Sequence, residues 1–283
     1  MISVAEALER ILAGVAPLGV EQVGLDVAHG RVLAEPAISR LTQPPVAVSS
    51  MDGYAVRAAD VATVPVALRR VGEAPAGGSY PHSVKPGECV RIFTGGPVPE
   101  GADAIVIQED TDVDGAQITI RESSAPGRYI RPAGLDFSAG DELISAGRIL
   151  TARDILLKAG ATVTARDIGL CAAMNQPSLT VRVKPRVAIL STGDELVNPG
   201  EQPGPNQIVS SNGVALAALV RCLGGEPVNV GIAGDTEDAL DKAALAAKSA
   251  DMLVTIGGAS VGDYDLVQSG LARHGLEIGF YKI

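Results

Sequence analysis

The residues best placed to do chemistry follow a short apolar run near the end of the sequence. Met252–Ile256 lies between turn signals and predicts a buried parallel strand. A loop of glycine, hydroxyl and carboxylate residues follows, namely Gly257, Gly258, Ser260, Gly262, Asp263 and Asp265. Glycines let backbone N–H groups approach an anion, and carboxylates hold a divalent cation that bridges to phosphate. The stretch predicts a pocket for a phosphorylated ligand with a metal; a tight turn with no ligand is the alternative.

Two earlier apolar runs end in the same kind of residues. The run Arg186–Leu190 leads into Ser191–Leu196 (S-T-G-D-E-L), and the run Pro227–Ile232 leads into Gly234 and Asp235. Since βαβ crossovers are right-handed, the carboxyl ends of all three predicted strands should lie at one side of a parallel sheet. Their coincidence predicts one binding site rather than three independent turns.

Single residues of this group also have simpler interpretations. Asp235 alone is most simply the N-cap of an Ala-rich helix over Glu237–Lys248. Asn212 is predicted to cap a helix that runs to Cys222. A further helix to about His274 and a fourth strand over Leu276–Tyr281 complete the pattern of alternating strands and helices.

A different pattern occupies residues 46–136. Short alternating runs between Gly/Pro clusters predict a small β-domain; they are Val64–Arg69, Cys89–Phe93, Ala104–Gln108 and Gln117–Arg121. Within it, Ser49–Val56 (S-S-M-D-G-Y-A-V) places an Asp-Gly turn before a strand. Arg91–Pro99 (R-I-F-T-G-G-P-V-P) ends a strand in a hydroxyl and two glycines. Taken alone, the first segment is more simply an ordinary turn and the second an ordinary loop.

The segments on either side of the β-domain are predicted to be helical or extended. Ser3–Glu6 is a capping box, and apolar residues at helical spacing predict a helix to about Ala13. Thr151 begins a second predicted helix that ends near Ala159. We therefore expect an α/β and β multidomain chain: a discontinuous first domain (1–45 and 137–176), an inserted β-domain (46–136) and a three-layer α/β domain (177–283).

Composition limits the classes of partner. The chain has 283 residues, a net charge of −10 and a pI near 4.8, which argues against nucleic acid because such binders need a basic face. No apolar run approaches the roughly 20 residues of a membrane span. Cys89, Cys171 and Cys222 are far apart in apolar contexts, so we expect three buried thiols and a cytoplasmic protein.

The motifs together resemble one family. Ser49–Val56, Arg91–Pro99 and Gly257–Asp265 (G-G-A-S-V-G-D-Y-D) are similar to segments of molybdopterin molybdenumtransferases, the MoeA family, which includes the gephyrin E-domain. The match also takes in Arg131–Asp136, Ser191–Leu196, Ser211-Asn212 and Gly234-Asp235, in order along the chain. M-D-G-Y-A together with S-V-G-D-Y-D is specific, whereas S-T-G-D-E-L is shared with related molybdopterin-binding domains.

The resemblance implies a reaction and its residues. The reaction is insertion of molybdate into adenylylated molybdopterin with release of AMP and with Mg²⁺, in a homodimer whose site joins the α/β domain of one subunit to the β-domain of the other. Molybdopterin adenylyltransferase and molybdoenzyme acceptors are possible further partners. The implied catalytic residues are Asp52, Thr94, Asp136, Glu195, Asp235 and Asp265, of which Glu195, Asp235 and Asp265 are metal ligands. The implied cofactor-binding residues are Thr192, Gly193, Asp194, Ser211, Asn212, Gly257, Gly258, Ser260, Gly262 and Asp263.

Two departures from the family pattern bear on activity. Val46, Ala47 and Val48 stand where the family usually has an aromatic residue and an Asp or Asn. Family members also continue past Ile283 with lysines of the molybdate site, so we expect a C-terminally truncated chain in which only Lys282 remains nearby. Hence two alternatives stay open. One is a catalytically weak pterin-nucleotide-binding or dimer-scaffold protein; the other, ranked last because that family lacks M-D-G-Y-A, is molybdopterin adenylyltransferase activity.

Overall fold

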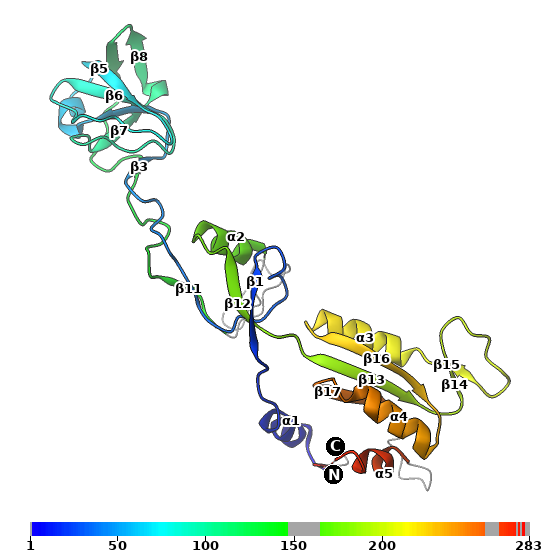
Figure 1. Cartoon of the computed structure of the whole chain (residues 1–283). Helices are drawn as coiled ribbons and strands as arrows, with labels where there is room; N and C mark the ends of the chain where they lie inside the picture. The colour runs from blue at the N-terminus through cyan, green and yellow to red at the C-terminus, as the bar shows by residue number, and fades with distance from the viewer. Residues whose placement is uncertain (1, 147–164, 258–265, 276, 278, 281–283) are drawn as a thin grey trace. The chain divides into compact units, whose positions relative to one another are not determined.

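The computed structural model describes residues 2–146, 165–257, 266–275, 277 and 279–280 (Figure 1). Packing divides the chain into two compact units. The first unit comprises Met1–Glu35, Ala146–Arg166 and Ser178–Ile283, and the second comprises Pro36–Ser145 and Asp167–Pro177. The three-domain division expected from the sequence stays a prediction.

The first unit opens with helix α1 (Val4–Ala13), as the capping box predicts. The Ser3 hydroxyl accepts a hydrogen bond from the Glu6 N–H at 3.2 Å, and Gly14 ends the helix. Strand β1 (Val20–Gly24) follows and pairs antiparallel with β12 (Ser178–Arg182), far along the chain. One apolar stripe of α1 is solvent-exposed; it consists of Val4, Leu8, Ile11, Leu12 and Val15 just beyond the helix.

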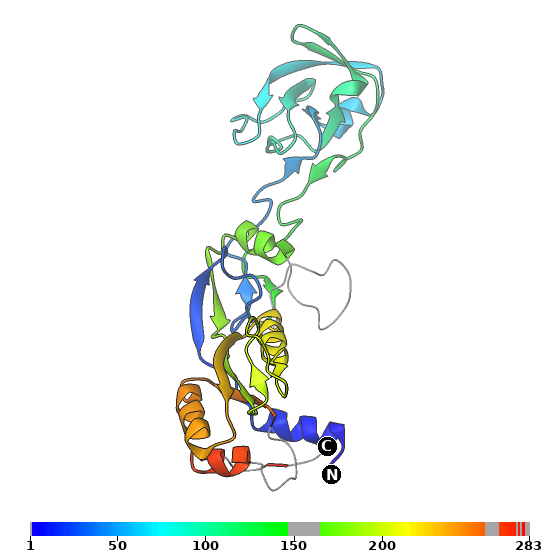
Figure 2. The same cartoon turned by 90° about the vertical axis from the view of Figure 1, so that its right-hand side faces the viewer.

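A parallel sheet in the order β16-β13-β17 forms the α/β part of this unit. Its strands are β13 (Arg186–Thr192), β16 (Glu226–Ala233) and β17 (Met252–Ile256). The chain crosses from β13 to β16 in one direction through α3 (Asn212–Cys222) and returns past β13 to β17 through α4 (Glu237–Ala247). Because both crossovers are right-handed, the two helices cover opposite faces of the sheet, as Figures 1 and 2 show.

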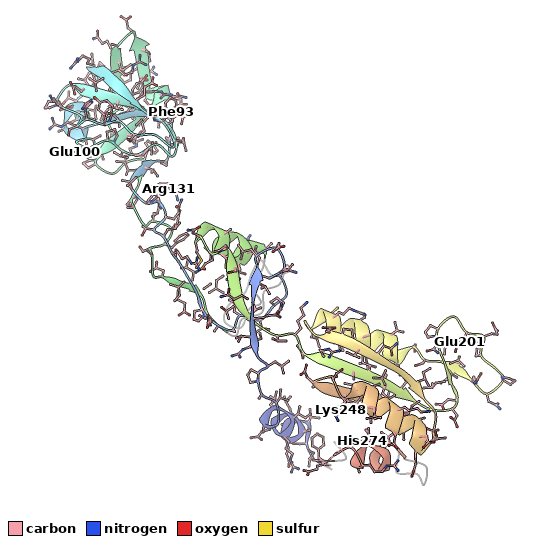
Figure 3. All side chains as sticks on the ribbon, viewed as in Figure 1. Phe93, Glu100, Arg131, Glu201, Lys248 and His274 are labelled. Carbon is pink, nitrogen blue, oxygen red and sulfur yellow. The ribbon has the colours of Figure 1, made fainter. Side chains whose placement is uncertain are left out.

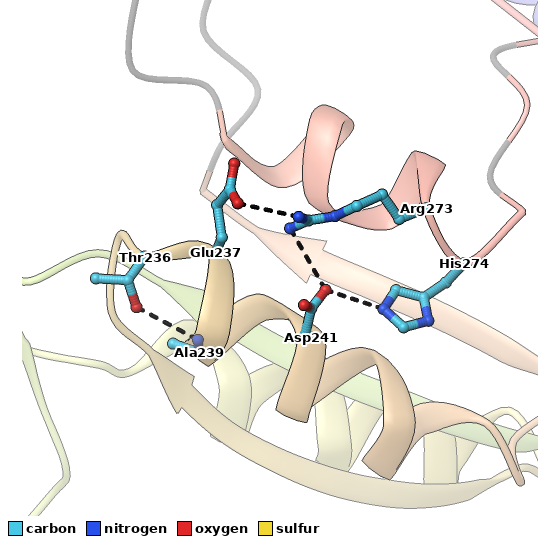
Figure 4. A network of polar contacts seen from close by, with 6 residues as sticks. All are labelled: Thr236, Glu237, Ala239, Asp241, Arg273 and His274. Atoms are coloured by element: carbon cyan, nitrogen blue, oxygen red, sulfur yellow. Dashed lines mark hydrogen bonds and ion pairs between the residues drawn. The ribbon is translucent and has the colours of Figure 1, made fainter.

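The core of this part lies between the sheet, α4 and α5 (Leu266–Ala272). It contains Leu190, Ala233, Leu240, Ala243, Val267 and Leu271. On the surface beside it, the Arg273 guanidinium binds the Glu237 carboxylate at 3.0 Å and lies 3.5 Å from that of Asp241 (Figure 4). The His274 ring also contacts Asp241, at 3.0 Å. These contacts attach the two residues that follow α5 to α4.

The second unit is built on a six-stranded sheet in the order β7-β4-β6-β5-β9-β8. The strands are β4 (Gly53–Val56), β5 (Val66–Ala74), β6 (Glu88–Ile92), β7 (Ala104–Ile107), β8 (Thr111–Asp114) and β9 (Gln117–Ile120). Only the β5–β6 pair is parallel among these neighbours. Buried side chains form a cluster on each face of β4 and β6, with Tyr54 and Cys89 in one and Ala55 and Val90 in the other.

Two short antiparallel pairs lie where the chain enters and leaves this sheet. Strand β3 (Val48–Ser49) pairs with β10 (Ile130–Arg131), and β2 (Ala37–Ile38) pairs with β11 (Glu142–Ile144). The segments before and after the six-stranded sheet are therefore joined to each other. Helix α2 (Ala165–Ala173) follows later in the chain, and the Arg40 N–H donates to the Met174 carbonyl just beyond it.

Several sequence predictions need correction. The predicted strand Val64–Arg69 is β5, which begins two residues later and extends to Ala74 because it pairs with β6 as well as β9. Cys222 is exposed at the end of α3, whereas Cys89 and Cys171 are buried. Burial raises the thiol pKa of Cys89 to about 12 and that of Cys171 to about 11.

Other predictions fall outside the described residues. The predicted helix from Thr151 to Ala159 lies there entirely, and the predicted strand Leu276–Tyr281 lies there in part. Among the described residues, no helix is both long and apolar enough to cross a membrane.

Gly53 allows a close approach of two strands that can be tested by substitution. A Cβ at Gly53 would overlap the carbonyl oxygen of Val106 on the neighbouring strand β7. We expect Gly53→Ala to lower the free energy of unfolding by about 1–3 kcal/mol, as overpacking does. Urea unfolding of the full chain measures this.

Gly169 in α2 of the same unit supplies the matched control. A Cβ there would meet no atom of the described residues within 4 Å. Gly169→Ala should therefore stabilise the chain by about 0.5–1 kcal/mol through helix propensity. A Gly53→Ala protein as stable as the wild type would contradict the proposed steric constraint.

Candidate functional site

The carboxyl ends of three parallel strands lie together in the first unit. In the sheet register, Thr192 of β13 is opposite Ala233 of β16, and Ser191 is opposite Ile256 of β17. The Gly193 N–H donates to the Ala233 carbonyl at 3.1 Å, and the Thr192 hydroxyl donates to the Ile256 carbonyl at 3.4 Å. The sequence prediction that these strand ends form one rim is confirmed.

Asp194 and Asp235 meet at this rim, and neither caps a helix. The Asp235 N–H donates to the Asp194 carboxylate at 3.1 Å. The prediction that Asp235 caps α4 is wrong, because the Thr236 hydroxyl accepts from the Ala239 N–H at 3.3 Å and occupies that role (Figure 4). Both carboxylates are exposed. The Asp235 carboxylate is thus not committed to the helix.

Gly257 is packed directly onto the end of the central strand. Its φ is +94°, and a Cβ there would lie 2.6 Å from the Thr192 carbonyl oxygen and 2.8 Å from the Thr192 hydroxyl. Only glycine meets both conditions without strain. The backbone at the start of the predicted anion-binding loop is therefore fixed against β13. The other predicted loop residues, Gly258, Ser260, Gly262, Asp263 and Asp265, lie outside the described residues.

The N-terminus of α3 adjoins the same rim. The hydroxyls of Ser191 and Ser210 lie 3.3 Å apart, immediately before the helix. The predicted cap Asn212 is instead the first helical residue, and Ser211 occupies the N-cap position. Within the described residues no side chain caps α3, and its first turn holds no acidic residue. Its N–H groups and dipole therefore favour an anion at this place.

The donor set at the rim fits Mg²⁺ chemically. Asp194, Glu195 and Asp235 are all exposed carboxylates, and Mg²⁺ prefers one or two carboxylates together with phosphate and water oxygens. Among the described residues no three His, Cys, Asp or Glu side chains converge as a preformed metal cluster. A metal that uses Glu195 and Asp235 would thus take further ligands from its bound ligand or from water.

A second set of predicted residues lies in the other unit, at the start of β4 and the end of β6. The Asp52 carboxylate accepts a hydrogen bond from the Thr94 N–H at 2.7 Å and another from the Thr94 hydroxyl at 2.8 Å. Both bonds lower the pKa of Asp52, and the bond from the Thr94 N–H has the larger effect. The positive charge of nearby Arg91 also lowers this pKa. The two predicted residues are brought together, with Asp52 held as a carboxylate.

Asp136 is paired with an arginine in the same unit. The Arg131 guanidinium donates to both carboxylate oxygens of Asp136, at 2.7 and 2.9 Å (Arg131 is labelled in Figure 3). The guanidinium carbon of nearby Arg128 lies 4.9 Å from the centre of the Tyr129 ring. Asp136 thus carries a compensated charge, and both arginines already have partners in the described structure.

Known proteins match both parts of the chain. A family model described as "MoeA N-terminal region (domain I and II)" matches residues 2–159, and one described as "Probable molybdopterin binding domain" matches residues 188–280. A molybdopterin molybdenumtransferase of Nostoc sp. is 41% identical over 263 residues, which are 91% of this chain and 57% of that protein. Molybdopterin molybdenumtransferase 2 of Mycobacterium tuberculosis is 37% identical over 276 residues, 92% and 64% of the two chains.

A solved structure agrees with these relatives. The MoeA molybdopterin biosynthesis protein of Pyrococcus horikoshii OT3 superposes with a TM-score of 0.80 at 30% identity, over 91% of this chain and 66% of that one. The parallel sheet and its rim lie in the part of the chain that matches the model of a probable molybdopterin binding domain. Since the first family model covers more than half of the sequence, the chain belongs to the MoeA family. It spans 57% and 64% of the lengths of the two relatives above.

The Asp52–Thr94 pair makes a prediction about pH. The folded-state pKa of Asp52 lies below its ordinary value of 3.8, so its contribution to stability is present above that value and is lost as the pH falls through the folded pKa. We expect Asp52→Asn to destabilise the chain at pH 7 and the difference from wild type to shrink below pH 3.8. Urea unfolding between pH 7 and pH 3 measures it; a difference independent of pH would contradict the assignment.

Proposed function

We propose that this chain acts in molybdenum cofactor biosynthesis, in the Mg²⁺-dependent insertion of molybdate into adenylylated molybdopterin with release of AMP. The supporting observation is the rim of the parallel sheet, where two carboxylates and a glycine backbone lie beside the N-terminus of α3, which no side chain of the described residues caps. A nucleotide-linked pterin phosphate combines anionic oxygens with a metal, and this rim offers groups for both.

The chain's own residues divide the work as follows. The Gly257 backbone and the N–H groups of α3 bind phosphate oxygens, and Thr192 holds Gly257 in place. Glu195 and Asp235 would hold Mg²⁺, which would neutralise charge as the phosphoanhydride breaks. Asp52, Thr94 and Asp136 are the proposed catalytic residues of the second unit. The hydrogen bonds from Thr94 lower the pKa of Asp52 and so favour its ionised form.

The first experiment is titration calorimetry of the chain with adenylylated molybdopterin, with and without Mg²⁺, followed by molybdate and an assay for AMP. We expect Glu195→Gln and Asp235→Asn to weaken Mg²⁺-dependent binding by about 10- to 100-fold, since each removes a charged ligand worth roughly 1.5–3 kcal/mol. Without Mg²⁺ the same variants should bind like the wild type or more tightly, because a negative charge near the phosphates is gone.

Glu226→Gln is the matched control. Glu226 is exposed at the first residue of β16, at the opposite end of the strand that leads to Asp235. An equal loss of affinity in this variant would contradict the assignment of the rim. Ligand binding without AMP release would contradict the proposed reaction and would favour the alternative of a pterin-nucleotide-binding protein.

We also propose that the chain is a homodimer. The apolar stripe of α1 supports this, because Leu8 and Leu12 are 55% and 62% exposed on a helix whose only buried residue is Ala7. A helix with such a stripe gains stability by covering it. The cytoplasmic location and the further protein partners expected from the sequence stay predictions.

Light scattering tests the dimer. At micromolar concentration we expect twice the chain's 28.8 kDa, and Leu8→Glu should shift the mass toward that of a monomer. Glu9→Gln, a change at the adjacent exposed position, should leave the mass unchanged. A wild-type chain that scatters as a monomer would contradict the proposal.

A further inference from the structure

Arg91 lies at the centre of a set of contacts around the Asp52–Thr94 pair. It is directly opposite Tyr54 in the antiparallel register of β6 and β4, so both side chains are on one face of the sheet. Its guanidinium carbon lies 5.3 Å from the centre of the Tyr54 ring and 4.8 Å from that of the Phe93 ring (Phe93 is labelled in Figure 3). Two aromatic faces thus restrict a side chain that is usually mobile.

The two terminal nitrogens of Arg91 have different partners. Nη1 donates to the Gly53 carbonyl at 2.9 Å, and Nη2 donates to the Gln108 side-chain oxygen at 2.7 Å. The backbone N–H of Gln108 donates to the Asp52 backbone carbonyl at 3.1 Å. Arg91 and Gln108 therefore fix both carbonyl groups of the Asp52-Gly53 segment.

The orientation of this segment decides where the Asp52 carboxylate points. On the other side of Gly53, an added Cβ would overlap the Val106 carbonyl, so strand β7 packs directly against this segment. Thr94 follows Phe93 by one residue, so the stacking of Phe93 on Arg91 also fixes the chain that carries the Thr94 N–H. One guanidinium consequently contacts the segments on both sides of the Asp52–Thr94 hydrogen bonds.

We propose that Arg91 is a positioning residue for the active site, which holds the Asp52 carboxylate and the Thr94 hydroxyl in one fixed geometry through the Gly53 carbonyl, Gln108 and Phe93. The catalytic relevance of this geometry rests on the proposed function, but the positioning itself does not. The side chain acts through its planar fork, which binds two acceptors at once, and a lysine ammonium cannot reproduce that geometry.

The test is NMR on the full chain, with ¹³C-labelled aspartate to follow the Asp52 carboxyl against pH and ¹⁵N-labelled threonine to follow hydrogen exchange of the Thr94 amide. In Arg91→Gln we expect the Asp52 pKa to rise, because a positive neighbour that lowers it is lost, and the Thr94 amide to exchange faster. In Arg91→Lys the charge remains, so the pKa should return toward the wild-type value while the Thr94 amide still exchanges faster.

Arg70→Gln is the matched control, because Arg70 lies on the neighbouring strand β5 and its ion-pair contact, with Glu73 at 4.0 Å, is long. It should change neither signal. Should Arg91→Gln fail to fold, Gln108→Ala removes one partner of the guanidinium at an exposed site and should still speed exchange of the Thr94 amide.

Three results would overturn the proposal: unchanged Asp52 and Thr94 signals in Arg91→Gln, equal changes in Arg70→Gln, or wild-type Thr94 exchange in Arg91→Lys. The AMP assay is a separate readout. If the wild type releases no AMP but the Arg91 variants shift both NMR signals as expected, the proposed function fails and the positioning stands. If AMP is released but the signals do not move, the positioning fails alone.

Discussion

The α/β part of the first unit depends on one constraint, the burial of β13 between two parallel neighbouring strands. Val187 through Thr192 are all buried, so this strand has apolar cover on both faces and a hydrogen-bonded strand on each edge. The register of such a strand against its neighbours is fixed, so the positions of the turns that follow the strand ends are fixed as well. Gly193, the Gly234–Asp235 turn and Gly257 are therefore brought together by the packing of the sheet, before any ligand contributes.

In the second unit, polar contacts rather than strand burial hold the candidate site residues in place. Asp52 follows no buried parallel strand; its place is set by hydrogen bonds from Thr94 and by the backbone contacts of its neighbour Gly53. The first arrangement is preorganised by apolar burial and the second by polar contacts at a half-exposed surface. The second is accordingly the one that responds to pH and to the loss of single polar groups.

Sequence patterns predicted the strands of both units because periodicity and burial agree there: Met252–Ile256 is found with its predicted bounds, and the three strand ends do meet. Helix caps were predicted less well. Asp235 and Thr236 are both residue types that cap helices well, and only the backbone conformation determines that Thr236 is the N-cap of α4. The pairing of β1 with β12 joins residues more than 150 positions apart, such as Gly24 and Ser178, and has no local sequence signal. Arg91 lies inside a recognised motif, yet its role emerges only when Tyr54 is seen across the sheet.

The pairing of β3 with β10 has a consequence for how this chain can vary. Once Ser49 and Ile130 are paired, the six-stranded sheet between them is a closed loop whose two ends are already together. The entropy of closing such a loop grows only with the logarithm of its length, by about 0.6 kcal/mol for each doubling. Turns within the sheet can therefore lengthen or shorten at little thermodynamic cost to the rest of the protein. The short β3–β10 pair thus separates changes of length inside the six-stranded sheet from the rest of the protein.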